Sequence, residues 1–562
     1  MKKFVAILLA VATILGCVAC SKAEETTKKK KKKTKKTTTE SVETEESTDE
    51  PTDETTDEPT DAPTSNPTDD TTEAPTDTTE DPNETGGVYE TWAVPDPFTM
   101  STGLTIRHDL EKLQIGRDLV YKVWGDLDPQ SEFEEVRYVK ARTDMVSVYE
   151  DGPLADAVSY KFTSLADDAA SMYAERLEKF LSSQQSGTLE RDTSYNVNTT
   201  VFRADSEYFS SMMEIVDYGL DFYDVQRVGA NYRYSDGSFI DITEVVTDMA
   251  ALTSYVKDKM DPYRYDYDET VQNVEDGACA WALLYDGIYI ENFGKVPVIG
   301  NEYMFDLSYF GATPETYALL ADKSGEILWD VNEDQFIDDI RISLETDASE
   351  ESVESLTISV NADQYVFTPN EIAYLADDYE FAENLEHYLV RTEYGYFLIV
   401  SLESYYWYHT CIFRVDENGV TFRTDGNYYV LEAFDPDNIL VGDTAYITGL
   451  EATRDTRRFS DIGILASTTI FKDVYSGPYK TKIDLPAQEV DLTDLSIGAD
   501  VTVPAGTMVA PILLDENTGL LIMRILDPDE SQTSYVVMET GGEYDIAGYH
   551  SYEALYGVIF GE

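Results

Sequence analysis

An acidic, proline-rich segment from Glu40 to Glu84 limits where this chain can fold. It contains many Asp and Glu residues and no Lys or Arg. It repeats Pro-Thr-Asp with a period of eight residues, starting at Pro51, Pro59, Pro67 and Pro75. This composition leaves almost nothing apolar to bury, so the segment is predicted to stay unfolded and extended. We expect residues 21–96 to form a disordered stalk, Lys-rich and then Thr/Pro/Asp/Glu-rich, with folding from Pro97 onward.

The N-terminus has the pattern of an export signal. A charged start, Met1–Lys3, precedes an apolar run from Phe4 to Leu15 that is shorter than the roughly 20 residues of a membrane-spanning helix. The stretch "ILGCVACSK" then resembles a bacterial lipoprotein lipobox, which implies cleavage before a lipidated cysteine and a signal peptide over residues 1–20. Cys20 is favoured because a polar chain follows it, and Cys17 is the alternative. A plain secretory signal, an uncleaved anchor and a Cys-x-x-Cys redox pair are the other interpretations, and the last needs a folded context.

The charge pattern bears on membrane attachment and on the class of binding partner. The Lys28–Lys36 run beside a lipidated cysteine would attract anionic headgroups, although it could equally be solvated chain. The whole chain has a net charge of −68, which makes nucleic acid a poor partner because phosphate neutralisation dominates such binding. The acidic chain would attract basic proteins or divalent cations. The simpler interpretation is that its negative charge keeps the protein soluble. We expect an extracytoplasmic protein anchored to the bacterial membrane by lipid.

Residues 97–562 are long enough for two or three domains. Short Tyr-, Val- and Ile-rich stretches between turn signals predict strands and hairpins. The turn signals are Asp236-Gly237, Asp286-Gly287, Asn418-Gly419 and Asp425-Gly426. Apolar residues at 3.6 spacing predict a helix over Ser164–Gln184 and a second over Asp248–Met260. The predicted class is α+β with a mainly β C-terminal half, apart from short helices at Glu371–Ala376 and Ser551–Tyr556.

Three segments carry a family resemblance: "VFRADSEYFSSMM" (201–213), "NYRYSDGSFIDITEVVTDMAALTSYVKDKM" (231–260) and "WALLYDGIYIENFG" (281–294). Their order resembles the extracytoplasmic domain of RsiV-type anti-sigma factors and PdaC-type peptidoglycan deacetylases, over roughly residues 130–345. The resemblance implies a mixed α/β domain in which Asp236-Gly237 turns a hairpin and Ile240 and Ile242 point inward. It also implies that Thr243 or Asp248 caps the next helix.

The sequence departs from this family in ways that bear on function. The segment "DYGLDFYDV" (217–225) has no histidine where the family often has Gly-Gly-x-His. The deacetylase catalytic domain and a cytoplasmic anti-sigma segment are not expected here, so neither activity is implied. What the resemblance implies is the binding role of the anti-sigma members, in which the domain recognises lysozyme, a basic protein.

The predicted organisation places the RsiV/PdaC-like domain at 97–345, a β-rich domain at 346–490 and a small module at 491–562. Within the last module, residues 501–542 read as strands joined by turns at Pro504–Gly506 and Asp515–Gly519. This stretch resembles the small barrels of SH3 type found in exported proteins.

The densest aromatic cluster is "SYYWYHTC" (404–411). On a strand, alternate residues share a face, so Tyr405, Trp407 and His409 lie on one side. Tyr406 and Tyr408 lie on the other. Such a face can stack on sugar rings or on a protein partner, and the alternative is a core face with an exposed tyrosine row. These five residues are the candidate ligand-binding residues.

The remaining chemistry-bearing residues form no recognised site. "DVNEDQFIDD" (330–339) begins like a calcium loop with Asp330, Asn332 and Asp334, but Gln335 replaces the required glycine and Arg341 the bidentate glutamate. The four histidines are scattered, with no zinc spacing. We predict no catalytic residue and no cofactor. Cys279 and Cys411 are expected as two buried free thiols, with a disulfide as the alternative.

The sequence therefore predicts a non-catalytic surface lipoprotein that binds an extracellular ligand, either a protein such as lysozyme or a wall glycan. One alternative is a cell-wall hydrolase, a glycosidase or amidase, without a recognisable motif. Another is a structural wall-spanning protein. A deep pocket lined by paired carboxylates would favour the hydrolase, and a flat aromatic patch would favour the binding protein.

Overall fold

The structure is a computed structural model that describes residues 104–558 with short gaps. The gaps are residues 133, 188, 190, 220–221, 333, 347–352, 373–374, 376–378, 381–385, 405–407, 446–450, 464, 528–533 and 542–543. The described residues belong to one compact unit. Cys17, Cys20, the Lys28–Lys36 run and the acidic repeats lie outside them.

The first sheet has five strands in the order β1-β2-β3-β4-β5. β2 and β3 are parallel, and the other neighbours are antiparallel. A parallel pair needs a long crossover, which α2 supplies between these two strands. The bounds are β1 Ile115–Leu127, β2 Val136–Val148, α2 Pro153–Gln185, β3 Thr193–Ala204, β4 Tyr208–Tyr218 and β5 Tyr223–Arg233.

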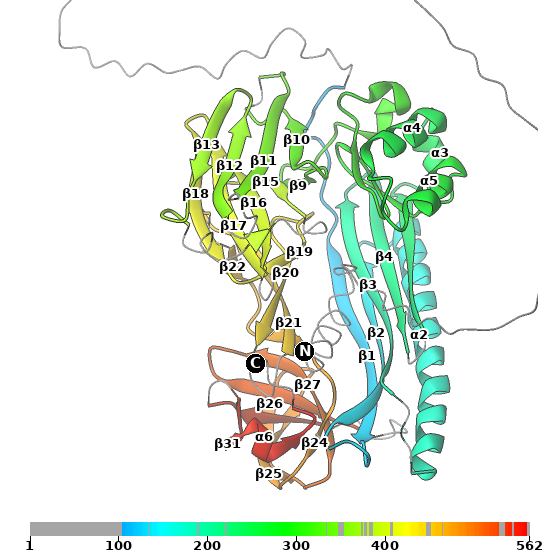
Figure 1. The fold of residues 1–562 in the computed structure, drawn as a ribbon, viewed down its shortest axis with the longest axis vertical. Helices are drawn as coiled ribbons and strands as arrows, with labels where there is room; N and C mark the ends of the chain where they lie inside the picture. Colours follow the sequence, from blue (N-terminus) through cyan, green and yellow to red (C-terminus); the bar gives the residue numbers. More distant parts are fainter. Residues whose placement is uncertain are drawn as a thin grey trace, which may run out of the picture. The chain divides into compact units, whose positions relative to one another are not determined.

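Helix α2 covers one face of this sheet (Figure 1). The sequence placed the start of this helix at Ser164, and that prediction is wrong because the helix begins at Pro153. The reason is that Leu154, Val158 and Phe162 continue the buried stripe toward the N-terminus. Proline is also favoured in the first helical turn, because the N–H it lacks would have no partner there.

Three short helices and a small antiparallel sheet follow. Asp248 caps α4 by accepting the N–H of Ala251 at 2.9 Å. Of the two candidate caps, Thr243 and Asp248, the structure confirms Asp248. Ile240 and Ile242 are buried, as expected. The elements are α3 Ile242–Val245, α4 Met249–Lys259, α5 Tyr267–Glu275, β6 Trp281–Leu283, β7 Gly287–Ile290 and β8 Gly294–Pro297. Two 3-10 helices follow, η1 Glu302–Met304 and η2 Leu307–Tyr309.

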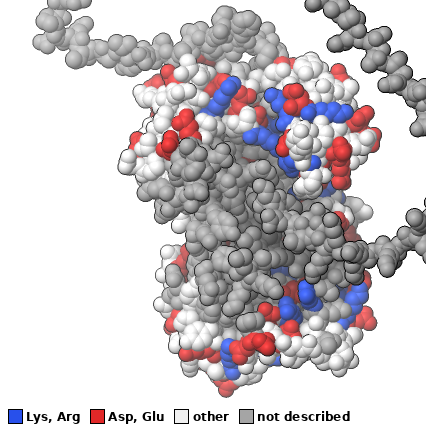
Figure 2. All heavy atoms as spheres, viewed as in Figure 1, with Lys and Arg blue, Asp and Glu red and all other residues white. Residues whose placement is uncertain are grey.

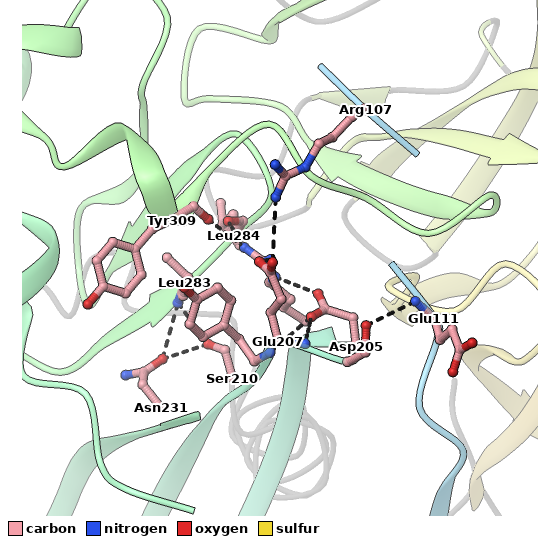
Figure 3. A network of polar contacts seen from close by, with 12 residues as sticks. Arg107, Glu111, Asp205, Glu207, Ser210, Asn231, Leu283, Leu284 and Tyr309 are labelled. Carbon is pink, nitrogen blue, oxygen red and sulfur yellow. Dashed lines mark hydrogen bonds and ion pairs between the residues drawn. The ribbon is translucent and has the colours of Figure 1, made fainter. Parts of the chain in front are cut away.

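A buried ion pair joins the β3–β4 turn to the chain that follows β6. The side chains of Arg203 and Asp205 are fully buried, and Arg203 Nε lies 2.6 Å from Asp205 Oδ2. Asp205 Oδ1 accepts the backbone N–H groups of Glu207 and Tyr208 at 2.8 and 2.9 Å. Arg203 also donates to the carbonyl of Tyr309 at 2.8 Å (Figure 3). The pair is therefore hydrogen-bonded on both sides, which its burial requires.

A second set of polar contacts lies beside this pair. Ser210 Oγ accepts the N–H of Leu283 at 2.7 Å (Figure 3). Asn231 Nδ2 donates to the carbonyl of Trp281 at 2.9 Å. These contacts tie β4 and β5 to β6, so the three segments on which the family resemblance rests meet in one place.

The rest of the described chain is mostly β-strand, which confirms a strand-rich α+β class. One sheet has the order β10-β11-β12-β13, and another has β18-β17-β16-β15-β9 with β14 paired to β16. Their bounds are β9 Tyr317–Leu320, β10 Glu326–Trp329, β11 Asp338–Thr346, β12 Val353–Val360, β13 Asp363–Phe367, β14 Tyr379–Glu380, β15 Tyr388–Thr392, β16 Gly395–Ser404, β17 Tyr408–Asp416 and β18 Gly419–Gly426.

The largest sheet has the order β19-β20-β21-β23-β27-β28-β29-β25-β26, with β22, β24 and β32 attached. Its strands are β19 Tyr429–Glu432, β20 Ile439–Ala445, β21 Glu451–Phe459, β22 Leu465–Ser467, β23 Lys472–Tyr475, β24 Tyr479–Thr481, β25 Leu485–Asp491, β26 Ser496–Val503, β27 Met508–Asp515, β28 Leu520–Ile525, β29 Ser534–Glu539 and β32 Leu555–Tyr556. A hairpin of β30 Asp545–Ile546 and β31 Tyr549–His550 precedes α6 Ser551–Ala554.

The strands described within residues 501–542 belong to this large open sheet and form no closed barrel, so the SH3-type module is not confirmed. The expected boundaries after residues 345 and 490 fall inside β11 and β25. The predicted helix Glu371–Ala376 lies partly outside the described residues.

Cys279 and Cys411 are buried free thiols, as expected, and burial raises the pKa of both. No helix among the described residues is long and apolar enough to cross a bilayer.

The Asp205→Ala variant tests the buried pair. It leaves the Arg203 guanidinium buried without its carboxylate, which costs about 3–5 kcal/mol of unfolding free energy. We expect a clearly lower urea midpoint. The control Glu175→Ala removes the exposed 2.7 Å pair with Lys179 on α2 and leaves the midpoint nearly unchanged, because exposed pairs contribute little. Equal midpoints for the two variants would contradict the role given to the pair.

Candidate functional site

The candidate site is a cavity of about 650 Å³ beside the first sheet. Side chains alternate between the two faces of a strand. On β3, Val197 and Val201 pack in the core that contains α2 residues, whereas Thr200 and Phe202 line the cavity. The cavity therefore lies on the face opposite α2. Its volume falls in the range of small-molecule sites, about 300–1,000 Å³.

Charged side chains form the deep end of this cavity. Arg142, Asp144, Arg454 and Tyr475 are each less than a tenth exposed. Asp144 Oδ2 lies 3.2 Å from Arg142 Nη2 and 3.0 Å from Arg454 Nη1. The two guanidinium carbons lie 4.4 and 5.1 Å from the centroid of the Tyr475 ring. Burial would raise the pKa of Asp144, but the two arginines outweigh it and lower that pKa to about 2.

Two pairs of aromatic rings line the cavity. The ring centroids of Phe202 and Tyr289 lie 4.9 Å apart and are stacked. Those of Tyr408 and Tyr429 lie 4.7 Å apart and are tilted. All four residues line the cavity. Flat rings beside polar groups provide faces on which a planar or ring-shaped ligand can pack.

Two further cationic side chains of the wall are also paired. Arg227 donates to Glu214 Oε2 at 2.6 and 3.0 Å. Lys295 Nζ contacts Asp286 Oδ2 and donates to the carbonyl of Leu320 at 2.6 Å. These contacts fix the polar side chains before any ligand arrives.

Glu386 and His387 are the titratable pair of the cavity. Burial raises the pKa of Glu386 to about 7, although the hydrogen bond that Tyr388 donates lowers it. Burial lowers the pKa of His387 to about 4, and His387 Nδ1 accepts the N–H of Ser401 at 3.2 Å. Near neutral pH the histidine is thus uncharged, and Glu386 keeps its proton to a higher pH than an ordinary glutamate does.

The four carboxylates that line the cavity differ in their partners. Asp144 and Glu214 bind arginines. Asp322 Oδ1 accepts two N–H groups, from Ser324 at 2.8 Å and from Glu326 at 2.9 Å. Glu386 differs from these three, since it accepts a hydrogen bond from the hydroxyl of Tyr388. It is therefore the lining carboxylate best suited to exchange a proton.

The structure places the predicted aromatic cluster as follows. Tyr405, Tyr406 and Trp407 lie outside the described residues. Tyr408 lines the cavity, as a ligand-binding role requires. His409 is not among the lining residues; it is fully buried, and its Nε2 lies 3.3 Å from Asp425 Oδ2.

The Asp330 loop uses its oxygens internally. Asp330 Oδ2 accepts the N–H of Gln335 at 2.8 Å, and Asn332 Oδ1 accepts the N–H of Asp334 at 3.0 Å. Asp334 Oδ1 accepts the N–H of Phe336 at 2.8 Å. Among the described residues, no group of three His, Cys, Asp or Glu side chains is arranged to hold a metal ion.

Sequence reasoning did not single out Arg142, Arg454 or Glu386. A signal for Arg142 exists, because Lys140, Arg142 and Asp144 occupy alternate positions on β2 and so place three charges on one face. No local pattern indicates that Arg142 and Arg454 share one carboxylate, since that contact depends on the tertiary fold.

Comparison with known proteins adds two structural likenesses. No family model matches this chain, and no curated protein matches its sequence. A DUF3298 family member from Bacteroides fragilis aligns with 35% of this chain and 95% of its own, at 11% identity and a TM-score of 0.26. A DUF3298 family protein from Pseudomonas aeruginosa aligns with 36% and 97%, at 12% identity and a TM-score of 0.24. TM-scores this low do not establish a shared fold.

The pH dependence of stability separates Glu386 from His387. The pKa of Glu386 is raised from 4.5 to about 7, so its contribution to stability is lost as pH rises through that window. The pKa of His387 is lowered from 6.5 to about 4, so its contribution is lost as pH falls through that window. The two trends oppose each other in the wild-type protein.

Compared with wild type, we therefore expect Glu386→Gln to lose a fall in the urea midpoint between about pH 4.5 and 7. Compared with wild type, we expect His387→Gln to lose a rise in the midpoint between about pH 4 and 6.5. Unfolding curves at half-unit pH steps would measure both. Identical pH profiles for the two variants and the wild type would show that neither group titrates in this way.

Proposed function

We propose that this chain is an extracytoplasmic lipoprotein, anchored through Cys20, that binds a wall glycan in the cavity without changing it chemically. The carrying observation is the cavity itself, in which two aromatic ring pairs stand beside fixed hydrogen-bonding side chains. Ring faces can pack on sugar rings, while arginine, glutamate and asparagine side chains can bind hydroxyl groups.

The pairing of charges favours an uncharged ligand. Arg142 and Arg454 share Asp144, Arg454 also lies 3.7 Å from Asp473, and Arg227 binds Glu214. Paired charges present donors and acceptors with little net field, which suits a molecule rich in hydroxyl groups more than a strongly anionic one. A glycan has that character.

A basic protein such as lysozyme remains the alternative ligand. The net charge of −68 would attract it at long range. On the face shown in Figure 2, however, acidic and basic side chains are interspersed over the described surface. The cavity is a more specific feature than this surface, and it supports the glycan.

A domain of RsiV/PdaC type over residues 97–345 is a finer part of this proposal. It is supported by the contacts among the three resembling segments, in which Arg203, Asn231 and Trp281 take part. A stalk over residues 21–96 would hold this domain away from the membrane.

A hydrolase acting on the same glycan is the second candidate, and Glu386 favours it. A carboxyl group with a raised pKa can serve as general acid in glycoside cleavage, but the reaction needs a second, reactive carboxylate. Asp144, Glu214 and Asp322 are each held by arginines or backbone N–H groups. Binding without cleavage is therefore the better-supported function.

The anchor is tested by cysteine substitution. We expect wild-type protein and Cys17→Ala to partition into the detergent phase of a Triton X-114 separation. Cys20→Ala should move to the aqueous phase or remain an unprocessed precursor, because it has no sulfur at the lipid attachment position. Mass spectrometry of the N-terminal peptide would identify the modified residue. A lipid lost only in Cys17→Ala would assign the anchor to Cys17 instead.

Ligand binding is tested by calorimetry on the full chain in mild detergent, with muramidase fragments of peptidoglycan and with lysozyme, at two salt concentrations. We expect saturable binding of the fragments that survives moderate salt. Tyr408→Leu removes one ring face and should lower affinity about fivefold, in line with about 1 kcal/mol per aromatic contact. The control Tyr160→Leu, on the exposed side of α2, should bind like wild type.

The same samples separate the candidate functions. Fragments that keep their length after the titration support binding alone. Shortened fragments, with shortening abolished in Glu386→Gln, would make the cavity a hydrolase. Lysozyme binding that vanishes with salt would reflect charge attraction only.

A further inference from the structure

The lining residues that are exposed to solvent lie in the β9–β10 turn and on β11, and the 261–266 loop contributes Arg264 to the wall. Among the lining residues, Lys323, Ser324 and Ser343 are exposed, and the side chain of Arg264 is 26% exposed. The Lys323 ammonium lies 5.5 Å from the ring centroid of Phe293, which also lines the cavity. The charged deep end is much less accessible, so a ligand would enter from this side.

Two tyrosines flank the arginine at this opening. Tyr263 is 93% exposed and Tyr265 is 81% exposed. Both tyrosines are chain neighbours of Arg264, which lines the cavity. Their Cα atoms therefore lie about 3.8 Å from that of Arg264. Exposed tyrosine rings next to a residue of the cavity wall offer faces on which a ligand can pack.

The loop holds this arrangement in place. Arg264 Nε and Nη2 donate to the two carboxylate oxygens of Asp266, both at 2.9 Å. Asp261 Oδ1 accepts the N–H of Tyr263 at 2.9 Å, and its carbonyl accepts the N–H of Arg264 at 3.1 Å. The backbone on both sides of the tyrosines is therefore fixed, which lowers the entropy lost when their rings meet a ligand.

We propose that Tyr263, Arg264 and Tyr265 form an outer subsite that binds the part of a glycan chain protruding from the cavity. The ligand is then an oligosaccharide that enters by one end, and affinity grows with chain length. This inference rests on the proposed glycan-binding function, and it adds that the recognised form is a chain rather than a single sugar or disaccharide.

The test is calorimetry on the full chain with two size classes of peptidoglycan fragment, a disaccharide and a chain of several disaccharides. Wild type should bind the longer fragment roughly 25-fold more tightly, since two further ring contacts are made. The double variant Tyr263→Ser/Tyr265→Ser should bind both with the affinity of the disaccharide. The matched control Tyr149→Ser/Tyr160→Ser removes two tyrosines that are 68% and 80% exposed and do not line the cavity, and it should keep the length effect.

Each outcome decides a different claim. No binding of either fragment to wild type would overturn the proposed function and this inference with it. Disaccharide binding without a length effect, or a length effect retained by the Tyr263/Tyr265 variant, would overturn the outer subsite alone. A variant that loses lysozyme binding while its glycan affinities match wild type would reassign the tyrosines to a protein partner. Unchanged urea midpoints would exclude unfolding as the cause.

Discussion

The Arg203–Asp205 ion pair is the interaction on which the arrangement of the cavity depends. Two fully buried charges cost several kcal/mol each to remove from water, so the pair persists only if its other hydrogen bonds are made. Two backbone N–H groups bind Asp205, and the Tyr309 carbonyl accepts from Arg203. The guanidinium also lies 4.6 and 4.8 Å from the ring centroids of Tyr208 and Tyr285.

This pair has a consequence for the neighbouring residue. The register between β3 and β4 shifts between Val201 and Arg203, and bulges of this kind redirect side chains. Arg203 fixes the end of β3 to the segment that follows β6, and Phe202 lines the cavity beside Tyr289 from β7. The stacked ring pair of the site is therefore built across two sheets that the ion pair connects.

The sequence predicts the turns, caps and helices of this protein better than it predicts the tertiary contacts between them. Asp236-Gly237, Asp286-Gly287 and the cap Asp248 act locally, so pattern reasoning finds them. Helix α2 is found but placed too late, because its first turns carry the same apolar stripe without a Ser, Thr, Asp or Asn cap. The SH3-type module was expected from strands and turns that recur in many β folds, and such local signals cannot distinguish a barrel from part of a larger open sheet.

The cavity illustrates what local reasoning does not reach. Tyr408 was singled out from its aromatic neighbours, and it does line the site, whereas His409 on the next position of β17 is buried away from it. The contact of Arg142 with Asp144 joins two positions on β2. Arg454 and Tyr475 come from β21 and β23 of the largest sheet, far from β2 in sequence. Only the tertiary fold brings these charges together.

A crystal structure of the full chain with a bound wall-glycan fragment would test the central claim most directly. The account predicts a sugar ring packed against Tyr408–Tyr429 or Phe202–Tyr289, with hydroxyl groups bonded to the paired charges of the wall. A sugar found on the α2 side of the first sheet, or on the surface with the cavity unfilled, would contradict it.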